Sequence, residues 1–199
     1  MTYCPLTAAQ PQLSFREYMG FTSYDTPRLS LRRFSEADLP VIAAYRRDPE
    51  VRSFQNFRDW TDEDQRKFLA EAQSNELEVP GNGLQIAVAL REIDMLIGDV
   101  YVRISDEEQA EIGYTFDPAW QNKGYATEAI TGLFSYLFGE EGLHRIVAIC
   151  AVENTRSYAL MNRVGMRREA HMKQSYRYHN VWHDEFMYAI LYEDWLLLP

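Results

Sequence analysis

The segment QNKGYATEA, residues 121–129, decides how this chain is interpreted. It lies between two strand-like segments, AEIGYTF at 110–116 and RIVAICAV at 145–152, with an apolar helix before the second. A Gly-rich turn that leads from a strand into a helix leaves backbone N–H groups free, and with the helix dipole they form an anion site. Gly124 permits close approach of a phosphate, and Ala126 is too small to obstruct it. The turn therefore predicts a phosphate site, with relief of crowding at a helix start as the alternative.

The bulk composition fits one compact domain. The chain has 199 residues, of which 46% are hydrophobic. No run approaches the roughly 18 apolar residues of a membrane span, and the start MTYCPLTAAQPQLSF lacks the features of a secretory signal. With only Cys4 and Cys150, no disulfide framework is expected. We expect a cytoplasmic protein that has no membrane partner.

The charge balance bears on partners. Thirty acidic and 20 basic residues give a net charge of −10. This excess opposes nucleic-acid binding and favours cationic or amine-bearing partners through long-range steering. Acidity that only keeps the protein soluble is an equally good explanation.

Hydrophobic periodicity predicts a mixed α/β domain over residues 25–199, preceded by an N-terminal extension over residues 1–24. Strands are expected at about 28–34, 84–91, 96–104, 110–116, 145–152, 166–173 and 184–191, and helices at about 35–47, 61–75, 124–138 and 157–164. Ser35 with Asp38, and Thr61 with Asp64, resemble capping boxes. Gly165 is expected to end the last helix.

Other phosphate-binding motifs fit less well. No Walker A loop and no G-x-G-x-x-G fingerprint is present, and GNG at 81–83 precedes a strand instead of a helix.

The neighbours of the turn form a longer pattern. It reads EIGY at 111–114, WQNKGYATEA at 120–129, ENTRS at 153–157 and GM at 165–166. Together these motifs resemble the GNAT superfamily of acyl-CoA N-acyltransferases, and more narrowly its Rim-type branch of ribosomal-protein N-terminal acetyltransferases. The agreement begins at TPRLSLR, 26–32, and includes Glu169, Asp184 and Tyr188. It implies the GNAT fold, an α/β fold with a mixed, mostly antiparallel central sheet, splayed strands and flanking helices.

The resemblance also implies a site for acetyl-CoA as co-substrate. The pyrophosphate would lie on the turn formed by Gln121, Asn122, Lys123, Gly124, Tyr125, Ala126 and Thr127. The strand 110–116 would bulge and splay from the strand 145–152, and the pantetheine arm would lie in the gap like an added strand. Thr115 and Phe116 would supply backbone contacts, and Asn154 would bind a pantetheine amide.

Two residues are candidates for catalysis by direct attack of an amine. Glu111 would collect the amine proton, directly or through water, or would only orient the substrate. Ser157 matches the serine that the Rim branch places at the thioester sulfur. Many GNAT enzymes instead use a tyrosine seven residues after the Asn, and Met161 occupies that position here. We expect Ser157 to hydrogen-bond the sulfur, with support of a short helix as the alternative.

In this family the acceptor enters between the loop after the first helix and the loop joining the last two strands, here 53–60 and 175–183. Both segments are aromatic. The candidate acceptor-binding residues are Phe54, Gln55, Trp60, Tyr176 and Trp182, with Phe57 and Asp59 beside them. Ordinary packing under long loops would explain any single aromatic residue as well.

Three other features carry less weight. His179 and His183 have zinc-like spacing, but they flank an expected strand turn without a Glu motif or nearby Cys, so no metal site is expected. Cys150 is expected to be buried packing. Of Arg156, Arg163, Arg167 and Arg168, one or two would meet the adenosine phosphate.

These inferences predict an N-acetyltransferase that moves acetyl from acetyl-CoA to a primary amine. A protein or peptide α-amine, which the resemblance to the Rim branch implies, is the first choice. Its deprotonation at pH 7 costs only about 1 kcal/mol against about 4–5 for lysine, so it needs little from a base. A small-molecule amine, such as an aminoglycoside or polyamine, is the second. A non-catalytic acyl-CoA-binding GNAT module and a nucleotide-binding protein remain alternatives, and a homodimer is possible.

Overall fold

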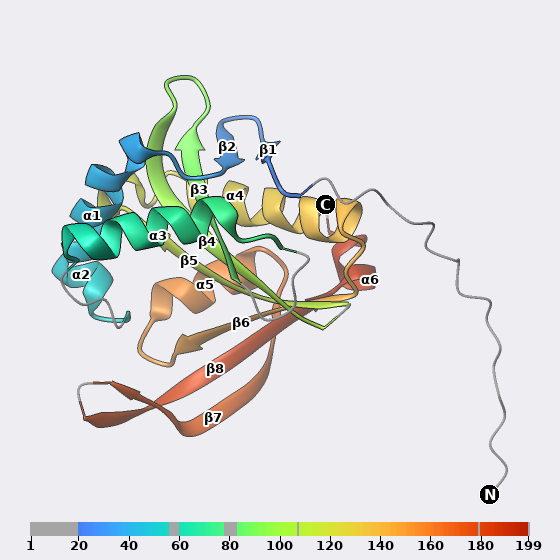
Figure 1. Cartoon of the computed structure of the whole chain (residues 1–199). Coiled ribbons are helices and arrows are strands. Elements are labelled where there is room, and N and C mark those ends of the chain that lie inside the picture. The colour runs from blue at the N-terminus through green and yellow to red at the C-terminus, as the bar shows by residue number, and fades with distance from the viewer. Residues whose placement is uncertain (1–19, 56–59, 78–82, 107, 179, 199) are drawn as a thin grey trace, which may run out of the picture.

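The computed structural model describes residues 20–55, 60–77, 83–106, 108–178 and 180–198 (Figure 1). Its strands are β1 Ser23–Asp25, β2 Leu29–Arg32, β3 Gly83–Leu90, β4 Met95–Asp106, β5 Gln109–Phe116, β6 Arg145–Ala151, β7 Arg167–Tyr178 and β8 Val181–Leu191. Its α-helices are α1 Leu39–Arg47, α2 Pro49–Arg52, α3 Asp62–Ser74, α4 Tyr125–Phe134, α5 Thr155–Arg163 and α6 Tyr192–Trp195. Short 3₁₀ turns span Glu36–Asp38 and Pro118–Trp120, and a π-helical turn, Ser135–Glu140, extends α4.

The strands form one eight-stranded sheet in the order β1-β2-β3-β4-β5-β6-β8-β7. Every neighbouring pair is antiparallel except β5 and β6, which are parallel. A parallel pair needs a crossover, and α4 supplies it between β5 and β6. The sheet is therefore mixed and mostly antiparallel, as the family resemblance implied.

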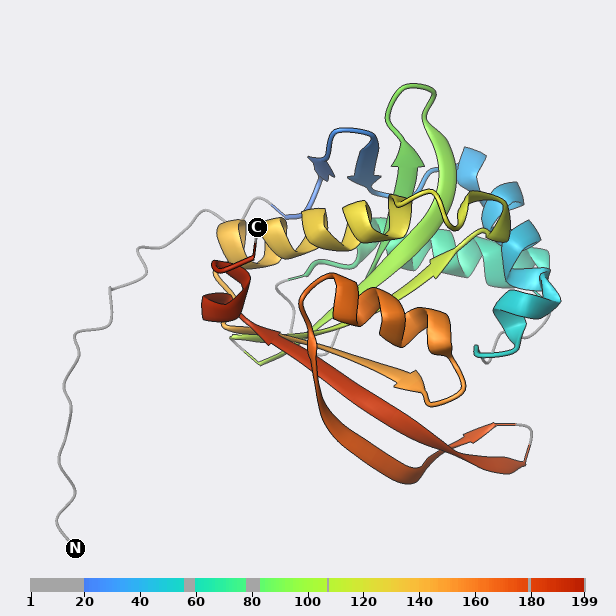
Figure 2. The same ribbon diagram turned by 180° about the vertical axis from the view of Figure 1, so that it is seen from behind.

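Helices cover both faces of the sheet. In Figure 1, α1 and α3 lie in front of it, and the view from behind in Figure 2 shows α4 and α5 on the opposite face. Alternating strand residues supply both cores. Val88 and Ile86 belong to the large cluster with α4 and α5, whereas Ala87 packs with Ile42 and Leu69 under α1 and α3.

Local capping fixes the helix starts that the sequence predicted. The side chain and backbone of Thr61 and Asp64 form a reciprocal capping box at α3. Ser35 and Asp38 form the same motif ahead of α1, and Asp38 also binds Arg32 of β2 at 2.8 Å. Because Asp38 is 3% exposed, this ion pair ties α1 to the sheet across a largely buried contact.

The parallel pair separates halfway along. β5 and β6 are paired only from Gln109↔Arg145 to Ile112↔Ala148. Beyond this point β5 remains paired with β4, and β6 with β8. The facing edges of residues 113–116 and 149–151 therefore carry no ladder to each other. The predicted splay is confirmed.

The predicted bulge in β5 is wrong. Its register with β4 is unbroken from Gly98↔Phe116 to Ile104↔Ala110, and the irregularity lies at the other end, between Ile104 and Asp106. Divergence of two twisted strands needs no inserted residue, because twist alone moves their ends apart.

Two more segments differ from the sequence prediction. Most of 175–183, expected as a loop, continues β7 and β8, because Tyr and Trp suit a half-exposed strand. Within the predicted extension, Phe21 is 2% exposed in the main core, and Ser23 and Tyr24 pair with β2. Among the described helices, none has both the length and the apolar composition needed to cross a membrane.

Candidate active site

The turn before α4 has the backbone geometry of an anion site. Gly124 is the N-cap of α4 and has φ 81°, in the left-handed region that favours glycine. Asn122 also has a positive φ, 60°. Left-handed residues in a tight turn can direct backbone N–H groups toward one side, and the helix dipole adds to the positive potential there.

A latch holds this turn against the start of β2. Glu128, in the first turn of α4, accepts hydrogen bonds from Thr26 Oγ1 at 2.7 Å and from the backbone and Nε of Arg28 at 2.7 and 2.5 Å. Arg28 also donates to the Lys123 carbonyl at 3.2 Å and lies over the Tyr125 ring. Burial raises the pKa of Glu128, but the hydrogen bonds from Thr26 and Arg28 outweigh it and hold that pKa below its usual range. Sequence reasoning missed the latch because no local pattern joins residues 100 positions apart.

A groove of about 720 Å³ runs from this turn to the end of β5 and the first turns of α5. We call it the main groove. The predicted cofactor-binding residues that line it are Thr115, Phe116, Gln121, Asn122, Gly124, Ala126, Thr127 and Asn154. Ser157, Phe54 and Gln55 line it too. The structure thus brings together residues from the end of β5, the turn, α4, α5 and the segment after α2.

The remaining two residues of the predicted turn site lie beside the main groove instead of lining it. Lys123 donates its Nζ hydrogen to the Ala119 carbonyl at 3.0 Å and lies over the Trp120 ring. Tyr125 lies under Arg28, 4.5 Å from the guanidinium carbon to the ring centre. Both side chains shape the turn from outside.

Ser157 has a fixed position at the mouth of the splayed strands. Asn154 is the N-cap of α5, and its side-chain oxygen accepts the Ser157 N–H at 3.1 Å. The Tyr114 hydroxyl on β5 lies 2.9 Å from Ser157 Oγ and donates to the Ser157 carbonyl at 3.1 Å. Burial raises the pKa of Tyr114 well above its usual range, so the hydroxyl keeps its proton. Sequence reasoning missed Tyr114; its place in EIGY, one residue before Thr115, was the available signal.

Glu111 lies further back on β5. It is opposite Arg103 of β4 in register, and the carboxylate binds the Arg103 guanidinium at 2.6 Å. Its side chain does not line the main groove. By strand alternation it shares a face with Thr115, opposite to the face of Tyr114. Its side chain is 35% exposed, so water can reach it.

On the side of Ser157 that faces away from the main groove, its surroundings are largely apolar and include Met161, Tyr158 and Cys150. Met161 is 1% exposed in the main core, where it cannot donate a proton. Tyr158 packs on Phe186, away from the main groove, as the 100° helical step predicts. Cys150 is 7% exposed, and burial raises its pKa to about 11, while the Ser157 hydrogen bond lowers it.

The two segments expected to hold the acceptor do meet. The Tyr178 hydroxyl on β7 donates to the carbonyls of Arg52 and Gln55 at 2.7 and 3.3 Å. Gln55 in turn donates to Thr115 Oγ1 at 2.6 Å. A continuous set of contacts therefore runs from the β7–β8 hairpin through the segment after α2 to the end of β5.

The predicted aromatic clamp is only partly assembled. Tyr176 stacks on Tyr178, and Trp182 is 55% exposed near the hairpin tip. Trp60 instead packs on Phe68 and Arg46 between α1 and α3. Phe57 and Asp59 lie outside the described residues.

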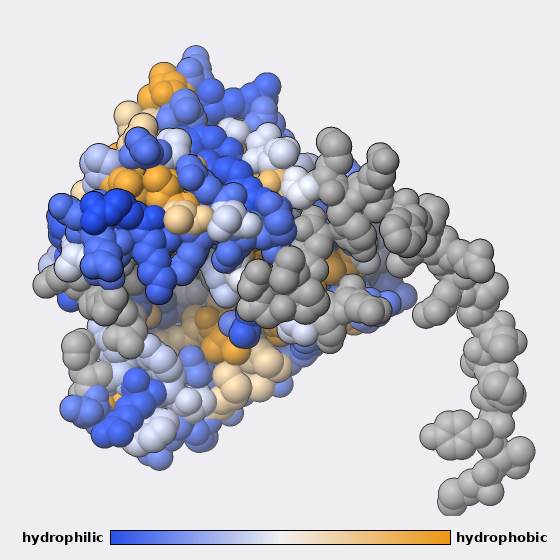
Figure 3. All heavy atoms as spheres, in the orientation of Figure 1, coloured by the Kyte–Doolittle hydropathy of each residue, from blue (hydrophilic) through white to orange (hydrophobic). Residues whose placement is uncertain are grey.

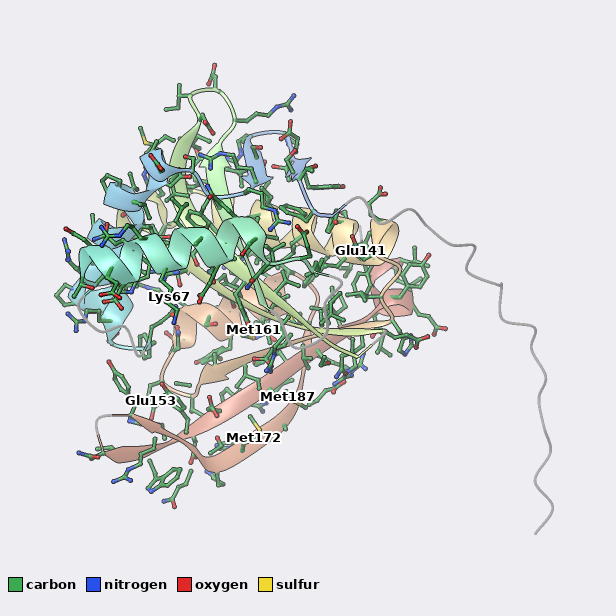
Figure 4. All side chains as sticks on the ribbon, viewed as in Figure 1. Lys67, Glu141, Glu153, Met161, Met172 and Met187 are labelled. Atoms are coloured by element: carbon green, nitrogen blue, oxygen red, sulfur yellow. The ribbon has the colours of Figure 1, made fainter. Side chains whose placement is uncertain are left out.

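The surface of the sheet between α3 and the hairpin is hollowed and apolar (Figure 3). Ile149 of β6 is 39% exposed and pairs with Met187 of β8, which lies on the lower part of the molecule with Met172 and Glu153 in Figure 4. Alternation places Glu185 on the same face as Met187. We call this surface, defined by Ile149, Met172, Met187 and Glu185, the acceptor hollow.

Only one of the two histidines with zinc-like spacing lies in the described part of the chain. His179 lies outside the described residues, and His183 has Nδ1 3.8 Å from Glu153. Within the described ranges, no group of three or more His, Cys, Asp or Glu side chains is arranged to hold a metal ion.

Comparison with known proteins identifies the family. Residues 28–167 match the acetyltransferase (GNAT) domain. The chain belongs to the GNAT acetyltransferase family. An N-acetyltransferase of Bacillus subtilis (strain 168), YnaD, is 39% identical over 171 residues, covering 85% of this chain and 97% of that protein. A solved GNAT acetyltransferase from Bacillus anthracis is 35% identical, with a TM-score of 0.76 and coverage of 86% of this chain and 99% of that one. The protein is thus a GNAT N-acetyltransferase.

Relatives whose acceptors are named are more distant. The ribosomal protein uS5-alanine N-acetyltransferase of Escherichia coli (strain K12) is 32% identical over only 84 residues, 42% of this acetyltransferase and 43% of that one. A solved spermidine N-acetyltransferase of Vibrio cholerae, in complex with CoA and spermine, has a TM-score of 0.73 at 21% identity, covering 86% and 99% of the two chains. Similarity at this level shows the fold alone. The family prediction is confirmed, but the narrower Rim branch is not established.

Proposed function

We propose that this acetyltransferase binds acetyl-CoA in the main groove and transfers the acetyl group to the α-amine of a protein or peptide. The observation that carries the proposal is the open edge between β5 and β6, with the Gly124 turn at one end and Ser157 at the other. Pantetheine amides can pair with such an edge as an added strand does. A solved structure of the same fold in complex with CoA supports acetyl-CoA as the co-substrate.

The turn fits a pyrophosphate. A side chain at residue 124 would have to adopt a left-handed backbone, and its Cβ would lie 3.4 Å from Arg28 Nη2. The left-handed backbone therefore favours glycine there. Arg156 and Arg163 line the groove nearby and supply positive charge for the phosphates.

When bound, the thioester supplies an activated acetyl group and a thiol leaving group with a pKa of about 8.5. Ser157 then donates a hydrogen bond to the leaving sulfur. Tyr114 cannot protonate the sulfur itself, because its raised pKa makes it a much weaker acid than the thiol. Its hydroxyl instead orients Ser157 Oγ. Glu111 collects the amine proton through water, since its side chain is solvent-accessible but does not line the groove.

The acceptor hollow supports an amine with an apolar neighbour. Ile149 and Met187 provide an apolar floor, and Glu185 provides negative charge for a cation. Glu153, which lines the main groove and lies 3.8 Å from His183 Nδ1, adds a second negative charge. The hollow is open at the surface, as a chain terminus requires (Figure 3). The same charges suit a polyamine, which remains the second candidate.

Calorimetry with acetyl-CoA tests the groove. We expect micromolar binding by the wild type and its loss in Gly124→Glu, which places charge and bulk at the pyrophosphate. Gly139→Glu is the matched control, because Gly139 lies beyond α4 with open space around its Cβ position. Absence of binding by the folded wild type, or equal losses in both variants, would refute the groove assignment.

The rate at which the CoA thiol is released from acetyl-CoA tests which class of amine is the acceptor. A peptide that contains lysine, in free and N-terminally blocked forms, is compared with spermine. Turnover of the free peptide alone supports an α-amine. Turnover of spermine alone moves the assignment to small-molecule amines.

A further inference from the structure

A second cavity lies on the other side of α5 from the main groove. It has a volume of about 500 Å³ and is lined by Val152, Tyr158, Asn162, Arg168, Phe186 and Tyr188. We call it the α5 cavity. None of these residues lines the main groove. Helix periodicity explains the separation, because Tyr158 and Asn162 are four residues apart on one face, whereas Ser157 and Leu160 face the groove.

Tyr188 contributes a hydroxyl to the cavity wall. The residue is 3% exposed, yet its hydroxyl makes no hydrogen bond to any residue that the structure describes. A hydroxyl in a cavity wall with no protein partner is therefore available to a ligand.

Arg168 provides the only charge in the lining. Its guanidinium carbon lies 4.5 Å from the centre of the Phe186 ring, and no carboxylate in the described part of the chain pairs with it. The adjacent Arg167 behaves differently, because it binds Glu169 at 3.0 Å and also Asp194.

The polar groups of the lining can all act as donors. Besides Arg168 and Tyr188, they are the Tyr158 hydroxyl and the Asn162 amide, and neither is hydrogen-bonded by its side chain to a described residue. No carboxylate lines the cavity. This set matches a ligand rich in acceptor atoms, and a guanidinium binds a carboxylate through two parallel hydrogen bonds.

The rest of the lining is apolar and aromatic. Phe186 meets the rings of Tyr158 and Tyr188 edge to face, with centroid separations of 5.8 and 6.5 Å. Val152 completes this surface. Such walls favour a planar apolar body over a fully hydrated ion.

We propose that the α5 cavity binds a small organic carboxylate with a planar apolar body. Its carboxylate would bind Arg168 and the Tyr188 hydroxyl, and its body would lie against Phe186 and Val152. The site is separate from the acetyl-transfer chemistry, so its existence does not depend on the identity of the acceptor.

Benzoate is the probe, titrated into the full chain by calorimetry or by NMR. We expect saturable binding with a Kd near or below about 1 mM. Arg168→Gln should weaken it at least tenfold, and Tyr188→Phe, which keeps the ring, should weaken it several-fold. Arg167→Gln is the matched control and should leave the Kd unchanged. Benzamide, which has the same shape without the charge, should bind at least tenfold more weakly.

Three results would overturn the proposal. One is no saturable benzoate binding by the wild type. Another is a benzoate affinity in Arg168→Gln and Tyr188→Phe that equals the affinity of the wild type. The third is a loss caused by Arg163→Gln but not by Arg168→Gln, which would place benzoate in the main groove. Thermal unfolding of each variant verifies that the changes in affinity belong to folded protein.

Discussion

The Tyr114 hydroxyl lies 2.9 Å from Ser157 Oγ, so a residue of β5 and a residue of α5 meet across the gap where β5 and β6 separate. The same hydroxyl lies 3.1 Å from the Ser157 carbonyl. A phenol has one proton and can serve only one of these acceptors fully at a time. When the proton is directed to Ser157 Oγ, the serine proton is free to point toward the leaving sulfur.

Ser157→Ala removes the proposed donor. We expect kcat to fall by about ten- to 150-fold, since loss of one hydrogen bond to developing charge costs about 1.5–3 kcal/mol. Acetyl-CoA affinity should be nearly unchanged, because the main groove keeps its turn contacts. Steady-state kinetics with calorimetry verifies both parts. An unchanged kcat would remove Ser157 from the mechanism.

Tyr114→Phe keeps the ring and removes the hydroxyl. We expect a fall in kcat of about fivefold, from the loss of roughly 1 kcal/mol of orienting hydrogen bond. The decisive measurement is the double variant with Ser157→Ala, which should be no slower than Ser157→Ala alone. If the two losses instead multiply, Tyr114 acts independently of Ser157.

How far the sequence predicted this structure depends on the range of each signal. Capping boxes at Ser35 and Thr61 and the turn at Gly124 are local patterns, and the structure has all three. The Arg28–Glu128 latch joins residues 100 positions apart, and no local pattern contains it. For the same reason the sequence located Ser157 but not its contact with Tyr114, which depends on where β5 and β6 diverge.

The hairpin shows a different limit. Tyr176, Tyr178 and Trp182 are strand formers, although the sequence prediction places 175–183 in the loop that joins the last two strands. Pairing between β7 and β8 stabilises the strand conformation of this segment, and a local sequence pattern does not contain that pairing. Trp60 likewise had no sequence signal for packing on Phe68 instead of joining the predicted clamp.

Glu128 makes stability depend on pH. Its folded-state pKa lies below the ordinary value of 4.5, so its contribution is fully present above that value and is lost as pH falls through the folded-state pKa. Glu128→Gln should therefore lower the free energy of unfolding by about 1–2 kcal/mol at pH 7, and this difference should shrink below pH 4.5. Urea unfolding across this range measures it. Glu92→Gln, in the exposed β3–β4 turn, serves as control, and a difference constant with pH would contradict the latch.

Cys150 should resist alkylation. With a pKa of about 11, about 1% of the thiol is ionised at pH 9, whereas a thiol with the ordinary value of 9.0 is half ionised. In a Cys4→Ser variant, iodoacetamide should react at pH 9 at least about 50-fold more slowly with folded than with unfolded chain. Similar rates in the two states would show that Cys150 is accessible and ordinary.

Tyr178→Phe tests whether the hairpin shapes the acceptor hollow. The hydroxyl tethers β7 to the carbonyls of Arg52 and Gln55, and this tether holds the hairpin beside the end of β5. Without it the hairpin should move more freely. We therefore expect KM for the amine to rise about three- to tenfold, which corresponds to the loss of one hydrogen bond. The Kd of acetyl-CoA should stay the same, because the Gly124 turn is untouched. Tyr192→Phe, at the other end of β8, is the control. A rise in the Kd of acetyl-CoA with KM for the amine unchanged would show instead that the tether supports the main groove.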